Sequence, residues 1–145
     1  MKKTVSPLEY KGRNIGIVAL VAAQVLIGFV HVVFGFWLLV ASRAASFANV
    51  VGLSSASDIY SIYTVTFGFL TLLFAVPLWL QNRWGWFGTF TVLVFIVVAD
   101  SLTLLDLPSI PGIPKFAGFG EITYSILVIA YLLQAHIRAK YKISF

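Results

Sequence analysis

Four long apolar stretches constrain the fold of this chain more than any other feature. They cover about residues 15–41, 59–80, 86–105 and 119–135, and none of them holds a lysine or an arginine. Because about 20 helical residues cross a bilayer core of about 30 Å, each stretch can span a membrane. Lipid offers the backbone no hydrogen-bond partners, so these stretches should be helices. The sequence therefore predicts an all-α bundle of four transmembrane helices with an up-down-up-down path.

The composition supports lipid as the solvent of this chain. Of its 145 residues, 60% are hydrophobic and 10% are charged, whereas soluble domains carry about 25% charged residues. We expect one integral membrane domain over residues 1–145, in the cell membrane as a multi-pass protein. The chain has no cysteine, which excludes disulfides and thiolate sites. Its net charge of +5 lies at the segment ends, so nucleic acid is not an expected partner.

The connections between the stretches suggest how neighbouring helices meet. The short turn Gln81–Gly85 makes the second and third helices antiparallel neighbours. Residues 107–118 are rich in proline and glycine and should form a loop. Ser57 and Asp58 suit the start of the second helix as cap and first-turn acid. Pro77, near the end of that helix, is a candidate for a kink.

Lysine and arginine are distributed unequally between the two sides. Two of them, Arg43 and Lys115, are expected on one side. Eight are expected on the other side, namely Lys2, Lys3, Lys11, Arg13, Arg83, Arg138, Lys140 and Lys142. By the positive-inside rule, the side with eight, which holds both termini, should face the cytoplasm.

Tryptophans and acidic residues follow the same division. Trp79, Trp84 and Trp86 should lie at the cytoplasmic interface, where amphipathic rings are favoured. Asp58, Asp106 and Glu121 should lie on the outer side, and the first turn of a helix would explain Asp58 and Glu121. No spacing resembles a calcium loop, and His136 lies far from His31, so we predict no metal site. With no nucleophile–base pair, phosphate loop or paired haem histidines, we predict no catalytic residues and no cofactor.

A short motif recurs at an offset of 40 residues in the first two helices. The stripe Gln24, Gly28, His31 and Gly35 corresponds to Thr64, Gly68, Thr71 and Ala75, at the helical spacing i, i+4, i+7 and i+11. One interpretation is that the polar members line a shared site. The favoured interpretation is helix packing, because small residues at Gly28, Gly35, Gly68 and Ala75 let backbones approach closely in a membrane.

Asp100 is the most informative polar residue, because it lies within the third apolar stretch. An acid at a helix centre costs about 2.5–3.5 kcal/mol on insertion scales and is a functional candidate by default. At 1.5 Å per residue, His31, Asp100 and Tyr124 all lie about 4–6 Å outward of their helix midpoints. The candidate ligand- or proton-binding set is His31, Asp100, Tyr124, Thr71 and Gln24, centred on a His31–Asp100 pair. Two alternatives remain, an interhelical hydrogen bond that sets register and a position of Asp100 at the outer rim.

The segment Leu78–Trp86 reads LWLQNRWGW and joins the second and third helices. Asp100, Asp106 and the loop dipeptide Pro111-Gly112 follow it. With the glycine-spaced first helix, this pattern resembles small prokaryotic four-helix integral membrane proteins of unknown function, and an archaeal source would fit. The resemblance implies a fold and not an activity, and it assigns no site residues.

Three functional classes follow. The leading one is a non-catalytic scaffold or accessory subunit of a larger membrane complex, because the soluble parts are too small for an enzyme and small-residue stripes favour association. Its expected partners are membrane lipids and either copies of this chain or other membrane subunits. The alternative is a small transporter or ligand-binding bundle around His31 and Asp100. A membrane-embedded enzyme acting on lipids or quinones is third.

Overall fold

The computed structural model describes residues 9–10, 13–43 and 58–144. Within these residues the chain forms helices joined by turns and loops, with a two-residue antiparallel ladder between β1 (Glu9–Tyr10) and β2 (Arg13–Asn14). The helices are α1 (Ile15–Arg43), α3 (Asp58–Trp79), α4 (Arg83–Leu104), α5 (Lys115–Leu132) and the short α6 (Ala135–Lys140). The first four are each long and apolar enough to cross a membrane. The predicted all-α fold with four candidate spans is confirmed.

Two helices begin earlier than the sequence suggested, α4 after the capping residue Asn82 and α5 after Pro114, which makes no side-chain cap hydrogen bond. Asn82 caps α4, since its side-chain oxygen accepts a hydrogen bond of 3.1 Å from the backbone N–H of Trp84. Pro114 precedes α5 with a φ of −69°, and proline suits a helix start because the first N–H groups have no intrahelical partner. Helix α5 therefore includes Gly118, which we had expected in the loop.

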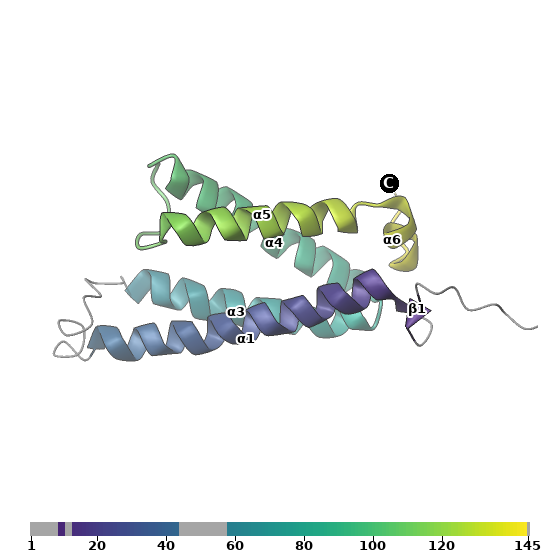
Figure 1. The fold of residues 1–145 in the computed structure, drawn as a ribbon, viewed down its shortest axis with the longest axis horizontal. Helices are drawn as coiled ribbons and strands as arrows, with labels where there is room; N and C mark the ends of the chain where they lie inside the picture. Colours follow the sequence, from purple (N-terminus) through teal and green to yellow (C-terminus); the bar gives the residue numbers. More distant parts are fainter. Residues whose placement is uncertain (1–8, 11–12, 44–57, 145) are drawn as a thin grey trace, which may run out of the picture.

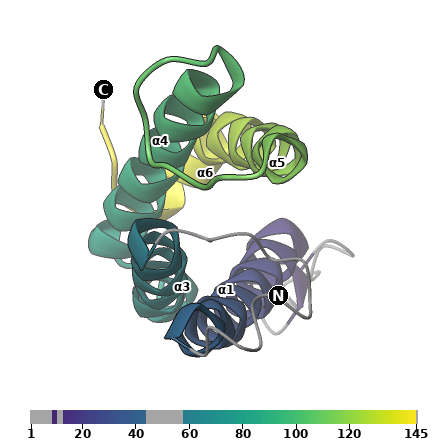
Figure 2. The ribbon, with the colours of Figure 1, turned by 90° about the vertical axis from the view of Figure 1, so that its left-hand side faces the viewer.

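The four long helices form two antiparallel hairpins, as Figure 1 shows. Helices α1 and α3 pair along their length, and α4 pairs with α5. Helix α4 crosses from α3 to α5, and the view along the helices in Figure 2 shows the two hairpins side by side. We call the end with β1, β2, α6 and the α3–α4 turn the terminal end, and the end with residues 105–114 the loop end.

Glycines bring α1 and α3 into backbone contact. A Cβ added to Gly28 would lie 3.0 Å from the carbonyl oxygen of Gly68, and one added to Gly68 would lie 2.7 Å from that of Gly28. A Cβ on Gly35 would lie 2.8 Å from the backbone nitrogen of Val65. Such close approach is available only to small residues, and it stabilises the hairpin through dispersion contacts. Ala75, the fourth small residue of the stripes, is buried at 2% exposure.

The terminal end holds the larger part of the apolar core. The indole N–H of Trp86 donates to the carbonyl oxygen of Leu132 at 3.0 Å, which joins α4 to α5. The hydroxyl of Tyr141, just after α6, donates to the carbonyl oxygen of Leu78 at 3.0 Å. Trp86 is 2% exposed, whereas Trp84 is 64% exposed; the interfacial depth of the tryptophans stays a prediction. The buried hydrogen bond explains the difference, because it satisfies the indole within the core.

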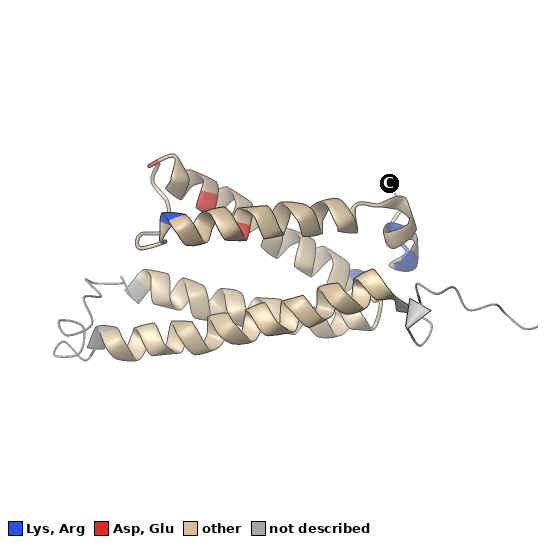
Figure 3. Ribbon diagram, viewed as in Figure 1, with Lys and Arg blue, Asp and Glu red and all other residues tan. Residues whose placement is uncertain are grey.

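Charged residues separate along the long axis of the molecule, as Figure 3 shows. Helix α4 begins with Arg83 and α6 carries Arg138 and Lys140, all at the terminal end. The acidic residues of α4, α5 and the loop between them, Asp100, Asp106 and Glu121, lie in the loop half, where Asp106 forms an exposed ion pair of 2.7 Å with Lys115. Which end faces the cytoplasm stays a prediction. Lys2, Lys3, Lys11 and the predicted cap Ser57 lie outside the described residues.

Candidate functional site

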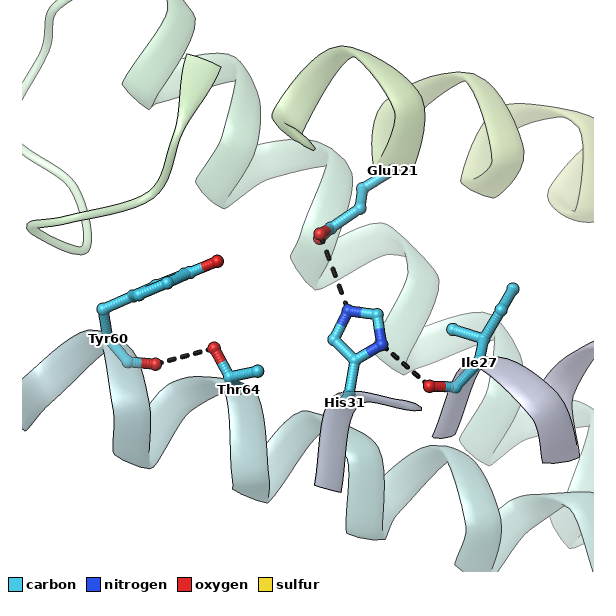
Figure 4. Close-up of polar contacts among 5 residues, drawn as sticks. All are labelled: Ile27, His31, Tyr60, Thr64 and Glu121. Carbon is cyan, nitrogen blue, oxygen red and sulfur yellow. Dashed lines mark hydrogen bonds and ion pairs between the residues drawn. The ribbon is translucent and has the colours of Figure 1, made fainter. Parts of the chain in front are cut away.

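Polar side chains from different helices meet in the loop half of the bundle. His31 on α1 and Glu121 on α5 face each other across the space between the two hairpins, as Figure 4 shows. Their closest atoms, Nε2 and Oε1, are 3.6 Å apart, and both side chains are partly buried. This ion pair joins the first hairpin to the second, so it links parts of the chain that are distant in sequence.

The orientation of His31 is set by its surroundings. Its Nδ1 lies 2.8 Å from the carbonyl oxygen of Ile27, and because a carbonyl only accepts, Nδ1 must carry a hydrogen. The ring meets Phe67 of α3 edge-on, with centroids 4.8 Å apart. Nε2 is thereby aimed at Glu121. The separation of 3.6 Å exceeds the 2.7–2.9 Å of a charge-assisted hydrogen bond, about 0.7 Å too long for a closed bond.

Glu121 replaces Asp100 as the ion-pair partner of His31. We had expected a His31–Asp100 pair and had assigned Glu121 to the first turn of its helix. Helix α5 begins at Lys115 and has no acid in its first turn, so Glu121 lies six residues into the helix. At that depth its side chain reaches across to α1.

Asp100 lies next to this pair and is completely buried, with 0% exposure. Among the described residues, neither of its carboxyl oxygens has a hydrogen-bond donor. Its carboxyl lies within electrostatic range of Glu121 and of His31. A Cβ added to Gly118 would lie 3.5 Å from Cβ of Asp100, so a glycine on α5 faces this acid.

A cavity of about 220 Å³ adjoins the ion pair. Its polar lining residues are His31, Glu121, Tyr124 and Ser125, and the rest of its wall is largely apolar. Ser125 is 0% exposed, and neither its hydroxyl nor that of Tyr124 has a hydrogen-bond partner among the described residues. Both hydroxyls are buried behind the wall of the cavity, whose exposed surface is almost wholly apolar. Tyr124, a candidate from the sequence, therefore lies at the same cavity as His31.

Gln24 lies at a separate polar contact. Its side-chain amide donates a buried hydrogen bond of 3.0 Å to the hydroxyl of Thr89, which joins α1 to α4. Gln24 is seven residues before His31 in α1, about 10 Å nearer the terminal end. The two members of the α1 stripe therefore face different neighbours.

Thr71 is buried but does not lie at the level of His31. Gly28 and Gly68 are in contact, and α1 and α3 are antiparallel. His31 follows Gly28 toward the loop end, while Thr71 follows Gly68 toward the terminal end. At 1.5 Å per residue, they are about 9 Å apart along the bundle axis. The two polar stripes therefore do not line one shared site.

Sequence reasoning missed three members of this region, namely Glu121, Ser125 and Tyr63. Tyr63 of α3 has a buried hydroxyl without a hydrogen-bond partner in the described part of the chain, within electrostatic range of Asp100 and Glu121. One signal was present in the sequence. Glu121, Tyr124 and Ser125 have the spacing i, i+3 and i+4, which places them on one helix face.

Within the described ranges, no group of three histidine or acidic side chains could hold a metal ion. Comparison of the chain with protein-family models, curated proteins and solved structures found no match. The resemblance to small four-helix membrane proteins stays a prediction from the sequence. The case for a function therefore depends on the geometry of the site.

Proposed function

We propose that this chain is a multi-pass membrane protein that binds a small positively charged ligand between its helices in exchange for a proton. The observation that carries the proposal is Asp100, a fully buried carboxyl with no donor among the described residues. It lies beside Glu121, which lines the cavity with His31. The proposal corresponds to the small transporter or ligand-binding bundle predicted as the alternative from the sequence.

The charges of the cluster favour a cation over an anion. When His31 is protonated and the two acids share one proton, the three groups are neutral together. Loss of one proton leaves a net negative charge, and burying an uncompensated charge costs several kcal/mol. A bound cation removes that cost. The other titratable groups that face the cluster are Tyr60 and Tyr63 on α3 and Tyr124 on α5, and tyrosine is neutral near pH 7.

The unmade hydrogen bonds speak against a purely structural role. A buried polar group without a partner costs about 1–3 kcal/mol. In the described part of the chain, this cost applies to Asp100 and, at the cavity, to Tyr124 and Ser125. It also applies to buried side-chain atoms elsewhere in the bundle, namely of Gln24, Ser61, Tyr63 and Thr71. A contact that served only to fix helix register would gain from closing these bonds. Binding and catalytic sites typically lower the stability of the folded protein, because function there requires groups that packing alone would not favour.

Proton release on cation binding tests the proposal. The full chain is purified in mild detergent, in weak buffer near pH 7, and methylammonium chloride is added while a pH-indicator dye reports released protons. We expect about one proton for each ligand bound, because the cation replaces the shared proton. Glu121→Gln and Asp100→Asn should abolish the release. Asp106→Asn is the matched control, since Asp106 is an exposed acid paired with Lys115, and it should release protons like the wild type.

Two results would contradict the proposal. One is the absence of proton release from the wild-type chain with methylammonium, sodium and potassium chloride alike. The other is equal release from the wild type and Glu121→Gln, which would place the binding elsewhere. The scaffold or accessory-subunit role, the lipid or quinone enzyme and homo-oligomer formation stay predictions from the sequence. A membrane subunit that co-purifies equally with the wild type and Glu121→Gln would support the subunit role.

A further inference from the structure

We infer that the terminal end of the bundle is a binding surface for the phosphate headgroups of anionic phospholipids, formed by Arg83, Lys140 and Lys142. This surface lies at the other end of the long axis from the cation site and does not depend on it. Three features support the inference: the unpaired positive charges, the fixed place of α6 and an apolar hollow beside Arg83.

The basic side chains of this surface lack acidic partners. Arg83 begins α4, Lys140 ends α6, and Lys142 follows it two residues later. Within the described residues, none of the three forms an ion pair with an acid. At the loop end, by contrast, Lys115 is neutralised by Asp106 at 2.7 Å. The terminal end is therefore where an anion finds unpaired positive charge.

The balance of charge at the terminal end is positive, as Figure 3 shows. Glu9 of β1 is an acid at this end, and Arg13 of β2 offsets it. Like charges that lie near one another repel, and an anion placed among them removes that repulsion. The excess also agrees with the predicted cytoplasmic position of this end, because the cytoplasmic leaflet is rich in anionic lipids.

Helix α6 is packed onto the bundle and does not extend α5. Figure 1 shows it lying across the terminal end. Ile137 and Tyr141 are 0% and 1% exposed and belong to the same apolar cluster as Leu78 and Leu132. The hydrogen bond from Tyr141 to Leu78 holds the end of α6 beside the α3–α4 turn, after which Arg83 follows directly. The basic residues are thereby gathered around one turn, so little order is lost when an anion binds.

Arg83 and Trp84 form the part of the surface that suits the level of lipid headgroups. The guanidinium carbon of Arg83 lies 5.7 Å from the ring centroid of Trp84, and both side chains are exposed. Guanidinium groups bind phosphate through two parallel N–H bonds, and indole rings are favoured at the interface between hydrocarbon and water.

An apolar hollow distinguishes a lipid from a free phosphate ion. Arg83, Trp84 and Phe87 line a hollow of about 270 Å³ whose surface is apolar. Phe87 lies four residues into α4 from Arg83, about 6 Å along the helix. A phospholipid places its phosphate at the arginine and its acyl chains along the apolar wall. A phosphate ion would leave that wall uncovered, so the arrangement favours the lipid.

The test compares dioleoyl phosphatidylglycerol with dioleoyl phosphatidylcholine, which have the same acyl chains and differ in net headgroup charge. The full chain in non-ionic detergent is titrated with each lipid in mixed micelles, and native mass spectrometry measures the lipids bound. We expect the wild type to bind phosphatidylglycerol at least about tenfold more tightly than phosphatidylcholine. Arg83→Gln, Lys140→Gln and Lys142→Gln should each lower phosphatidylglycerol affinity by about fivefold, and together they should remove the preference.

Two variants serve as controls. Lys115→Gln removes the same charge at the loop end and should bind phosphatidylglycerol like the wild type. The charge-preserving variant with Arg83→Lys, Lys140→Arg and Lys142→Arg should keep the preference, which separates a loss of charge from a loss of fold. Equal binding of the two lipids by the wild type overturns the inference, as does an equal loss in Lys115→Gln. Displacement of phosphatidylglycerol by an equal concentration of inorganic phosphate would mean that the surface is a site for soluble anions.

The cation site and the lipid surface can fail separately. Proton release with methylammonium should be the same in the three-residue glutamine variant as in the wild type, because Asp100 and Glu121 lie in the loop half. If the wild type prefers phosphatidylglycerol but releases no proton, the lipid surface stands and the cation site is wrong. Proton release without any lipid preference would give the reverse conclusion.

Discussion

The two ends of this bundle are built in opposite ways. At the terminal end, Leu78, Leu132 and Ile137 are each 0% exposed, and buried donors such as the indole of Trp86 reach backbone acceptors. In the loop half, the apolar cluster is small and consists of Leu38, Tyr60 and Ile113 with a few partly buried neighbours. The terminal end therefore holds the hairpins together through packing and satisfied hydrogen bonds.

Most of the buried polar side chains without a hydrogen-bond partner in the described residues lie in the loop half. Asp100, Ser125 and the hydroxyls of Tyr63 and Tyr124 are without hydrogen-bond partners among the described residues. The His31–Glu121 ion pair at 3.6 Å links α1 to α5 in this half. The comparison shows that the satisfied contacts and most of the unmade hydrogen bonds lie in different parts of the bundle along its axis. Mutations at the two ends should therefore change the free energy of unfolding in opposite directions.

The largest expected effect is at Gly85, where α4 turns back against α3. A Cβ here would collide with backbone atoms of Pro77 and Leu78, and backbone cannot move aside as a side chain can. We expect Gly85→Ala to lower the free energy of unfolding by about 3 kcal/mol, at the upper end of typical overpacking costs. Thermal unfolding in mild detergent measures it. Gly120→Ala is the matched control, since its Cβ meets nothing within 4 Å, and it should change stability by less than about 1 kcal/mol. Equal losses would mean that the two ends are packed alike.

A smaller effect is expected at Tyr141, whose hydroxyl donates to the carbonyl oxygen of Leu78. Tyr141→Phe removes this hydrogen bond and should cost about 1 kcal/mol at neutral pH. Burial, together with nearby Tyr131, raises the pKa of Tyr141 above its ordinary value. Since the folded-state pKa exceeds that of the unfolded chain, the stabilising contribution is complete below about pH 10 and is lost as the pH rises further.

Unfolding measured from pH 7 to 11 checks this dependence. The stability difference between the wild type and Tyr141→Phe should shrink above about pH 10. A difference that grows with pH would show that the hydroxyl is not held as a donor in the folded state.

The smallest and opposite effect is expected at Asp100. Asp100→Asn keeps the shape, removes a buried carboxyl without a donor in the described structure, and adds an amide that can donate to Glu121. We expect stability to be unchanged or higher by up to about 1 kcal/mol. Asp106→Asn, which breaks an exposed ion pair, should lower stability by about 0–1 kcal/mol. A clear loss of stability in Asp100→Asn would mean that Asp100 stabilises the fold. The loop half would then hold the hairpins together as the terminal end does, and the two ends would not differ in this respect.

The positions of the four long helices could be predicted from the sequence. The predicted spans overlap α1, α3, α4 and α5 closely, because hydropathy over about 20 residues is a local property. Helix α6 was missed, since six residues with alternating polarity make no hydropathy signal. The candidates His31 and Tyr124 do lie at one cavity, while Gln24 and Thr71 lie elsewhere along the axis.

The ion-pair partner of His31 could not be predicted from the sequence. We placed the start of the last helix near residue 119, and the structure places it at Lys115. An error of four residues moves a side chain by about 6 Å along the axis, enough to make Glu121 seem a terminal residue. Helix α5 begins directly after Pro114. In the sequence alone, a proline at this position fits the start of a helix and a loop equally well.

By itself the sequence determined that this chain has four apolar helices, because the cost of exposing backbone groups to hydrocarbon acts on each segment separately. Only the tertiary structure decided that His31 meets Glu121 and that Asp100 lies behind them without a donor in the described residues. Those contacts depend on the depth and rotation of α1, α4 and α5 relative to one another, which no single segment contains.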